Sequence, residues 1–308
     1  MNRRSKLALA VCGVAILSLT LVAYGYQQPA PAEEPASPQT MPAPTMTMLA
    51  DGVYHYFGLF GSSLVVVSDD QVLITDPSNP ARAQSLKDEI AKLTKTPVTT
   101  IALTHEHYDH VGGTGVFPDA EVVCHINCQP NFDLDSLGDV PVVDTTFEDQ
   151  LEIPVGDKTV QLHYLGPGDG EATTIIYMPD EDIIVTADMY EPRALTHKNW
   201  VDDKNSTGTR YILNTISQWP ITHAINAHSP GTDPMDMMEN VEYYNDLYEA
   251  VYSALAAALE QGGFPALFGV FQSLPNTLQL SKYQDWANYD TSFPRHVERM
   301  LQAITHAD

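Results

Sequence analysis

The sequence predicts a mixed α/β domain that ends in a helical extension, and three observations support this. Short apolar runs, rich in β-branched residues and bounded by Gly, Pro or Asp, recur along most of the chain, which is typical of buried strands. After Pro80, Leu86, Ile90 and Leu93 repeat at helical spacing, which indicates a helix packed on a sheet. A longer apolar stripe over residues 237–259 predicts a long helix.

The amino terminus has the pattern of an export signal. Three basic residues precede an uncharged apolar run from Leu7 to Gly25, as in the positive and apolar regions of a signal peptide. We expect residues 1–25 to be this signal, or an uncleaved membrane anchor through residues 7–25, because 19 residues approach the ~20 that a bilayer core requires. In both cases the rest of the chain is expected to be exported, to the periplasm or the cell exterior.

The next segment predicts a linker, and the folded part follows it. Residues 26–46 hold six prolines and no apolar periodicity, which is typical of an extended, solvated tether. We expect one folded domain over residues 47–232. Because Asp233 and Pro234 form a good helix start, residues 233–308 are expected to be a helical extension of the same domain.

The apolar runs give the order of the predicted strands. The helix that begins at Pro80 lies between the second and the third strand, and residues 179–182 join two later strands as a hairpin. The predicted strands are Ser63–Val67, Val72–Thr75, Thr100–Leu103, Glu121–Cys124, Thr159–Tyr164, Thr173–Met178, Ile183–Ala187 and His223–Ala227.

The composition restricts the class of partner. The 308 residues include 15 Lys and Arg against 40 Asp and Glu, which gives a net charge of −25. Such a field repels phosphate backbones, so we expect no nucleic-acid partner and a small-molecule substrate that is neutral or cationic. The same charge is typical of saline surroundings, where salt screens the repulsion.

The cysteines exclude a disulfide-built scaffold. The chain holds only three, and a chain of this length can bury a core without such bridges. If the amino-terminal segment is removed, Cys124 and Cys128 remain. They either form a disulfide in an oxidising compartment or stay as buried free thiols.

One segment has the pattern of a metal site. It directly follows the predicted strand over residues 100–103 and reads Thr-His-Glu-His-Tyr-Asp-His-Val-Gly-Gly. Three imidazoles and a carboxylate on a loop that leaves a strand are typical metal ligands. His105 and His107 can face one cation, while Asp109 and His110 turn toward a second. Two cations ~3.5–4 Å apart would share a hydroxide.

This segment resembles the metallo-β-lactamase-fold hydrolase superfamily, whose HxHxDH motif it matches in full at residues 105–110. The resemblance covers about residues 48–232 and includes the strand over residues 72–76, which ends in Ile-Thr-Asp. It implies a four-layer αββα sandwich, in which two mixed sheets pack face to face with helices outside. The metal site is then expected at one edge of the sandwich.

The resemblance also implies further ligands and a cofactor. In that family a bridging carboxylate follows a short hairpin and its strand, and Asp188 occupies this place. The last family histidine ends a later strand, where His228 stands. The cofactor is expected to be two divalent metal ions, with zinc as the first choice.

One residue departs from the family pattern. The family places a histidine after a Gly-Pro-x or similar turn, and here the turn at residues 165–168 is followed by Asp169. Asp169 either replaces the histidine as a ligand or is a plain turn residue. In the second case the first metal site is weak or empty, or His163 or Glu171 takes over. A third bound aspartate lowers the net formal charge of the two cations and their ligands from +2 to +1, which favours iron or manganese over zinc.

The function implied is a metal-dependent hydrolase. A metal-bound hydroxide would attack an ester, lactone, amide or thioester bond of a small molecule. Asp109 would bind metal and orient the hydroxide, and Tyr190, two residues after the bridging aspartate, would hydrogen-bond an oxyanion or leaving group. The irregular stretch over residues 191–205, with Trp200, is expected to overhang the site.

Two other functions stay open at this point. Related members of the superfamily use a single iron to oxidise persulfides, and Asp169 would suit such an iron site. In a non-catalytic binding protein, the same aspartate would mark a degenerate metal site.

Overall fold

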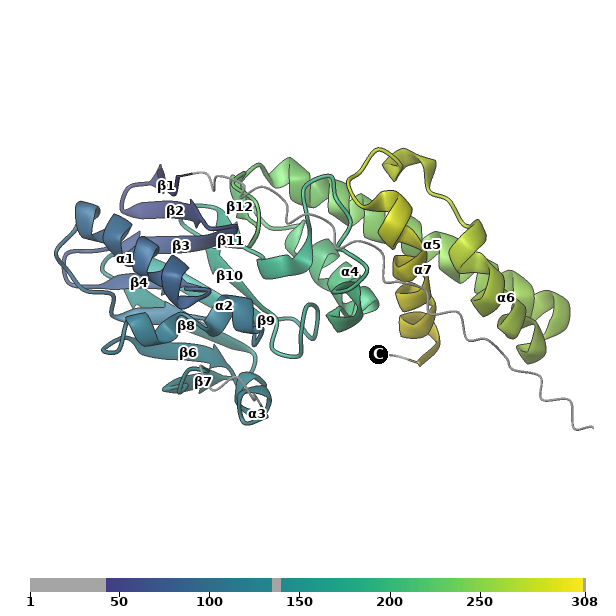
Figure 1. Ribbon diagram of the computed structural model, residues 1–308, viewed down its shortest axis with the longest axis horizontal. Helices are drawn as coiled ribbons and strands as arrows, with labels where there is room; N and C mark the ends of the chain where they lie inside the picture. The colour runs from purple at the N-terminus through teal and green to yellow at the C-terminus, as the bar shows by residue number, and fades with distance from the viewer. Residues whose placement is uncertain (1–42, 135–139, 307–308) are drawn as a thin grey trace, which may run out of the picture. The chain divides into compact units, whose positions relative to one another are not determined.

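The computed structural model describes residues 43–134 and 140–306. The predicted signal or anchor over residues 1–25 lies outside the described residues, as does most of the predicted linker. Within them, two sheets lie in adjacent layers with helices on their outer faces (Figure 1). The predicted sandwich of two sheets and flanking helices is confirmed. None of the helices described is long and apolar enough to cross a bilayer.

The first sheet has seven strands in sequence order and is mixed. Its first four strands pair antiparallel, and the fourth to the seventh pair parallel. The strands are β1 (Thr45–Ala50), β2 (Val53–Gly58), β3 (Gly61–Val67), β4 (Val72–Thr75), β5 (Thr100–Ala102), β6 (Glu121–His125) and β7 (Thr145–Phe147).

The second sheet has five strands in the order β12-β11-β10-β9-β8. Only β11 and β12 pair parallel, so this sheet is mixed as well. The short turn after β10 makes an antiparallel hairpin with β11, as predicted. The strands are β8 (Gln150–Val155), β9 (Lys158–Tyr164), β10 (Thr174–Met178), β11 (Ile183–Val185) and β12 (His223–Ile225).

The inner strands β3 and β4 of the first sheet are buried along almost their whole length because both faces are covered. On β3, Leu64 and Val66 point into the core between the two sheets, while Val65 packs on the opposite face. There it meets Leu86 and Ile90 of the helix that begins at Pro80. This alternation explains why the strands read as continuous apolar runs rather than as alternating patterns.

The helices begin where capping residues predict. Asn79 caps α1 (Pro80–Leu93) by accepting from two backbone N–H groups, and Asp233 caps α5 (Pro234–Gly262) in the same way at one N–H group. The other helices are α2 (Tyr108–Val111), α3 (Cys128–Phe132), α4 (Ser206–Ile216), α6 (Phe264–Thr277) and α7 (Tyr289–His306), with short 3-10 turns η1 (Thr114–Val116), η2 (Ala187–Met189), η3 (Val201–Asp203) and η4 (Ser281–Tyr283).

The carboxy-terminal helices share a core with the second sheet. Leu247 of α5 and Val297 of α7 belong to the same buried cluster as Ile184 of β11. The helical extension therefore packs directly on the sheet, as its apolar stripe predicts.

Two details differ from the sequence expectation or complete it. The first strand begins at Thr45, inside the predicted linker, and β1, β2, β7 and β8 were not among the predicted strands. Cys124 and Cys128 form a disulfide with their Cα atoms 6.2 Å apart, so the free-thiol alternative does not apply to this structure.

A buried arginine ties the first sheet to α1. The Arg82 guanidinium donates to the Gly58 carbonyl, the Ser63 hydroxyl and the Asp76 carbonyl, each at 3.0 Å. Its side chain is fully buried and lies over the Tyr56 ring. Burial lowers the pKa of Arg82 to about 10, and the group still carries its charge at neutral pH.

We expect Arg82→Met to lower the free energy of unfolding by about 3 kcal/mol, because three buried acceptors lose their donor. Urea denaturation followed by circular dichroism measures this. Lys92→Met on the exposed face of the same helix is the matched control, and its effect should stay below about 1 kcal/mol. Equal losses in both variants would contradict the structural role of Arg82.

Candidate metal centre

Strand ends and one short helix carry the predicted ligands. His105 and His107 lie on the loop after β5, and Asp109 and His110 lie in α2, which begins directly after His107. The next two residues, Gly112 and Gly113, leave no room for a side chain, because a Cβ at either position would lie 2.8 Å or less from other atoms. The tight turn of α2 therefore keeps the motif in one place.

The structure brings all seven predicted ligands together in two groups. Within each group, one ligand atom from each residue lies within 4.8 Å of the others. The first group is His105, His107 and Asp169, and the second is Asp109, His110, Asp188 and His228. In the second group, the Asp188 Oδ2 atom lies 3.2 Å from His228 Nε2 and 3.4 Å from His110 Nε2.

Hydrogen bonds at the Nδ1 atoms orient two of the imidazoles. His228 Nδ1 donates to the Phe60 carbonyl at 2.8 Å, at the tip of the β2–β3 hairpin. His110 Nδ1 lies 3.2 Å from the Asp76 carboxylate. Both rings therefore turn Nε2 toward Asp188, which is how metal-binding histidines are usually held.

Asp76 was not predicted as a site residue. It ends the strand β4, and its carboxylate also accepts from the Thr104 N–H and hydroxyl at 2.9 and 2.6 Å. Asp76 adopts a positive φ of 36°, which is uncommon for a residue other than glycine. The carboxylate that ends the Ile-Thr-Asp strand was the available signal.

The donor set fits a metal ion. His110 Nε2 and Asp188 Oδ1 are buried, and neither has a hydrogen-bond partner among the described residues. Burial would lower the pKa of His110, but Asp188 and Asp76 raise it well above the ordinary value. Burial would raise the pKa of Asp188, but His110 and His228 hold it well below the ordinary value. The positive charge on the histidines thus compensates the negative charge of the carboxylates in the absence of a metal ion, which would compensate that charge when bound.

The loop that carries Asp169 is fastened by Glu106, which the sequence analysis gave no role. The Glu106 carboxylate accepts from the backbone N–H groups of Glu171 and Ala172 at 2.7 and 3.1 Å. Gly170 has a φ of +83°, and a Cβ there would lie 2.8 Å from the same carboxylate. The Gly-Asp-Gly turn is thus needed to place Asp169, which is 3% exposed.

The structure distinguishes the alternatives for the missing histidine. Asp169 lies in a ligand group, as expected if it replaces the histidine. His163 hydrogen-bonds Gln161 and lies tilted against the Trp219 ring, and Glu171 is exposed. Neither residue belongs to a ligand group, so the expectation that one of them takes over is not met.

A buried lysine also lies at the centre, and nothing in the sequence analysis pointed to it. Lys204 Nζ lies 3.5 Å from Asp169 Oδ2 and donates to the Asp188 carbonyl. Burial raises the pKa of Asp169, and the Lys204 ammonium opposes this shift. Lys204 is 35 residues away from Asp169 in the sequence, so no local pattern connects them.

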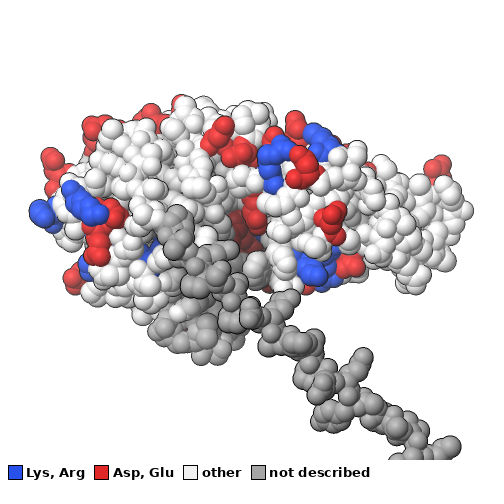
Figure 2. All heavy atoms as spheres, turned by 45° about the horizontal axis from the view of Figure 1, so that its top comes forward, with Lys and Arg blue, Asp and Glu red and all other residues white. Residues whose placement is uncertain are grey.

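The two ligand groups open into one cleft of about 690 Å³. Its walls include Asp109, Asp188 and His228 on one side, and Glu191, Thr196, Trp200 and Asp203 from the segment predicted to overhang the site. The Trp200 side chain is 65% exposed. Figure 2 shows acidic atoms deep in a hollow near the middle of the molecule's face.

Tyr190 is one of the residues that line the cleft, as a donor to the substrate would be, but its hydroxyl group is already bonded in the core. Its side chain is 3% exposed and belongs to the core of the helical extension. The hydroxyl donates to the Ala224 carbonyl at 3.2 Å, and burial raises its pKa far above the ordinary value. The hydroxyl therefore has its partner in the core rather than in the cleft.

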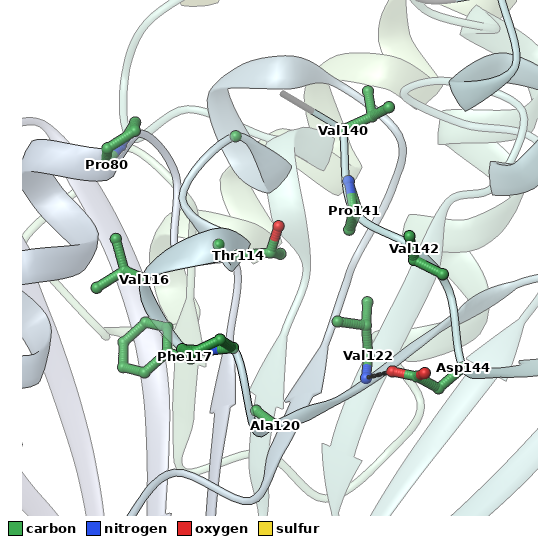
Figure 3. A pocket seen from close by; sticks show the side chains of 13 residues that line it. Pro80, Thr114, Val116, Phe117, Ala120, Val122, Val140, Pro141, Val142 and Asp144 are labelled. Carbon is green, nitrogen blue, oxygen red and sulfur yellow. Dashed lines mark hydrogen bonds between the residues drawn. The ribbon is translucent and has the colours of Figure 1, made fainter. Parts of the chain in front are cut away.

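A second cavity, of about 570 Å³, lies beside the start of α1 and next to β6 (Figure 3). Val116, Phe117 and Val142 supply apolar side chains to its wall, and Thr114 and Asp144 supply polar ones. Asp144 is the only titratable side chain among its described lining residues, and it already accepts from the Val122 N–H at 2.9 Å. This cavity has no ligand group of the kind found in the cleft.

The fold and the ligand groups define a metallo-hydrolase type of protein. A profile of the metallo-beta-lactamase superfamily matches residues 56–225, more than half of the 308 residues, and the chain belongs to this superfamily. The match ends before His228 and before the helical extension.

Three proteins have sequences similar to this chain. Metallo-beta-lactamase type 2 of Bacteroides fragilis is 26% identical over 56% of this chain and 73% of its own length. The alpha subunit of a 2,4-dinitroanisole O-demethylase of Nocardioides is 26% identical over 59% of this chain, which spans 53% of that subunit. A probable metallo-hydrolase of Bacillus subtilis is 23% identical over 58% of this chain and 90% of its own length.

Solved structures share the fold. A metallo-beta-lactamase from Pontibacter korlensis superposes with a TM-score of 0.58 at 16% identity, over 66% of this chain and 99% of that one. The enzyme FIM-1 from Pseudomonas aeruginosa, in a mono-zinc form, superposes with a TM-score of 0.55 at 13% identity, over 66% and 95%. The remaining third of this chain has no counterpart in these two structures.

We expect Asp76→Asn to weaken metal binding about tenfold or more, because His110 loses the carboxylate that orients its ring. Competition with a chromophoric zinc chelator measures the affinity. Asp70→Asn, on the exposed turn before β4, is the control and should leave it unchanged. Unaltered affinity in Asp76→Asn, with the fold intact, would contradict this role.

Proposed function

We propose that the protein is a metal-dependent hydrolase that cleaves an ester, lactone, amide or thioester bond of a small molecule. The observation that carries this is the pair of adjacent ligand groups that open into a single cleft. Two divalent ions held there would supply an activated water molecule and polarise the bond under attack.

The residues of the second group have distinct roles in this proposal. His110 and His228 both turn Nε2 toward the Oδ2 atom of Asp188, and these three side chains would hold a metal ion. Asp109 is 62% exposed, and its Oδ2 atom lies 3.7 Å from both of those Nε2 atoms. Its carboxylate therefore reaches from the ligand group into the cleft, where it can orient a water molecule and accept a proton from it.

The two alternative functions fit the site less well. A single iron with two histidines and a carboxylate would occupy only the first group. The second group, which includes His110, Asp188 and His228, would then bind no metal. A degenerate site would have lost ligands or the groups that orient them. Here the ligands are complete, and Asp76 and Phe60 still orient the histidines.

The cleft supports a neutral or cationic substrate. Glu191 and Asp203 add negative charge to the cleft beside the ligand aspartates, so a polyanion would be repelled. Trp200 offers an exposed aromatic face, which suits an apolar or cationic part of the substrate. One relative is named for its action on 2,4-dinitroanisole, which is a small neutral aromatic compound.

We further propose zinc as the metal and an exported location. The zinc proposal rests on the imidazole-rich donor set, and the location rests on the amino-terminal sequence pattern. An exported protein would also encounter the oxidising conditions in which the Cys124–Cys128 disulfide persists.

The direct test is elemental analysis of the purified protein combined with a hydrolysis assay. We expect two equivalents of zinc and metal-dependent hydrolysis of at least one of three probes: p-nitrophenyl acetate, a γ-lactone and a chromogenic β-lactam. Chelation should abolish the activity and zinc should restore it. Tightly held iron with oxygen consumption, or hydrolysis that survives chelation, would contradict the proposal.

We expect Trp200→Ala to raise KM about tenfold for the aromatic probes with little change in kcat, because the exposed ring binds substrate without contacting the ligand groups. Steady-state kinetics measures this. The control is Tyr211→Ala, which removes an exposed aromatic side chain outside the cleft lining. A fall in kcat at constant KM would contradict a role for Trp200 in substrate binding alone.

A further inference from the structure

Asp169 and Lys204 form a buried ion pair at the edge of the first ligand group. Lys204 Nζ lies 3.5 Å from Asp169 Oδ2, and the two side chains are 5% and 4% exposed. The same ammonium donates to the carbonyl of Asp188, a member of the second group. The lysine therefore contacts one ligand residue of each group.

Backbone contacts hold the two residues in register. Asp169 and Lys204 pair as an isolated antiparallel β-bridge. The next residue, Asn205, donates its N–H to the Gly168 carbonyl at 2.7 Å and caps α4. Arg299 of α7 donates to the Lys204 carbonyl at 3.2 Å. Because three elements converge on it, Lys204 has a fixed place.

Asp169 and Lys204 each need the other's opposite charge, because both side chains are buried among further charged groups. Asp169, Asp188, Glu191 and Tyr244 act on the ammonium, and His105 and His296 also lie within reach of its charge. Asp169 in turn is attracted by Lys204, His107 and His110 and repelled by Asp188. An uncompensated charge at this depth is strongly unfavourable, so neither the aspartate nor the lysine is suited to its position alone.

We propose that Asp169 and Lys204 together replace one neutral histidine ligand, with Asp169 supplying the donor oxygen and Lys204 cancelling its charge. This inference rests on the proposed function, since it takes both ligand groups to bind metal. Two divalent cations with three aspartates carry a net formal charge of +1, and Lys204 returns it to +2. The sequence-based expectation that a third bound aspartate lowers the net charge to +1 and favours iron or manganese over zinc is thereby revised.

Lys204 is a positioning residue in this account, because it acts through Asp169. The proposal has an unusual consequence. Asp169→His, which restores the usual ligand of the superfamily, should weaken zinc binding, because the buried ammonium then lies beside a cation with no carboxylate between them. Removing the lysine as well should restore the affinity.

A double-mutant cycle in the full chain tests this with Asp169→His, Lys204→Met and the double variant. Zinc affinity is measured by competition with a chromophoric chelator, and Tm is measured on the metal-free proteins. We expect Asp169→His to lose about tenfold or more in affinity and the double variant to recover to within a few-fold of the wild type. Each single variant should lower Tm by roughly 5–10 °C, and the double variant should regain most of it.

The matched control is Lys198→Met, which removes an exposed lysine from the same segment and should change neither readout. Should Asp169→His not fold, a second cycle of Asp169→Asn, Lys204→Gln and the variant with both changes makes the same test with smaller changes of shape. Asp169→His that binds zinc as tightly as the wild type, or effects that simply add in the double variant, would overturn the pairing.

The outcomes also separate this inference from the proposed function. If the wild type binds two zinc ions and the cycle shows recovery, but no probe is hydrolysed, the pairing stands and the hydrolase proposal fails. If the wild type hydrolyses a probe and the effects simply add, only the pairing fails. A wild type that binds no zinc would overturn both.

Discussion

The burial of negative charge at the common edge of two sheets is the constraint on which the rest of this structure depends. Asp76, Asp169 and Asp188 are taken out of water where the ligand loops meet, and each would be costly there without a partner. Asp76 is paired with His110, Asp169 with Lys204, and Asp188 with the histidines of its own group. The loops, the short helix α2 and the tight glycine turns place these partners.

Much of the fold follows from local patterns, and the gaps have physical causes. The strands that lie between two covered faces are continuous apolar runs, so Val72–Thr75 and Thr100–Ala102 were predicted. The strands β1 and β8 lie at sheet edges and consist mostly of exposed and half-buried residues, so no continuous apolar run marks them. The ligand motif was visible because four of its residues lie within six positions of the sequence.

The partners of the ligands were not visible, because they are fixed by tertiary structure. Nothing in the sequence near Lys204 indicates that it will meet a residue 35 positions earlier, and an acidic, lysine-poor chain gives no reason to single out one lysine. The sequence-based count included only the two cations and the three aspartate ligands. The net charge of +1 that it gave was therefore too low by the one charge of Lys204. A substitution in a ligand set has to be judged with the second residue that the fold brings to it.

The helical extension is best understood as part of the metal centre. Three residues on one face of α7 hold the segment that walls the cleft: Arg295 pairs with Asp202 at 2.7 and 2.8 Å, His296 donates to the Thr196 carbonyl at 2.9 Å, and Arg299 bonds the backbone of Lys204. The superfamily profile ends at residue 225, so it contains none of these contacts. A core sandwich supplies most of the ligands, but the wall of the cleft and the lysine that balances its charge are held in place by helices added after it.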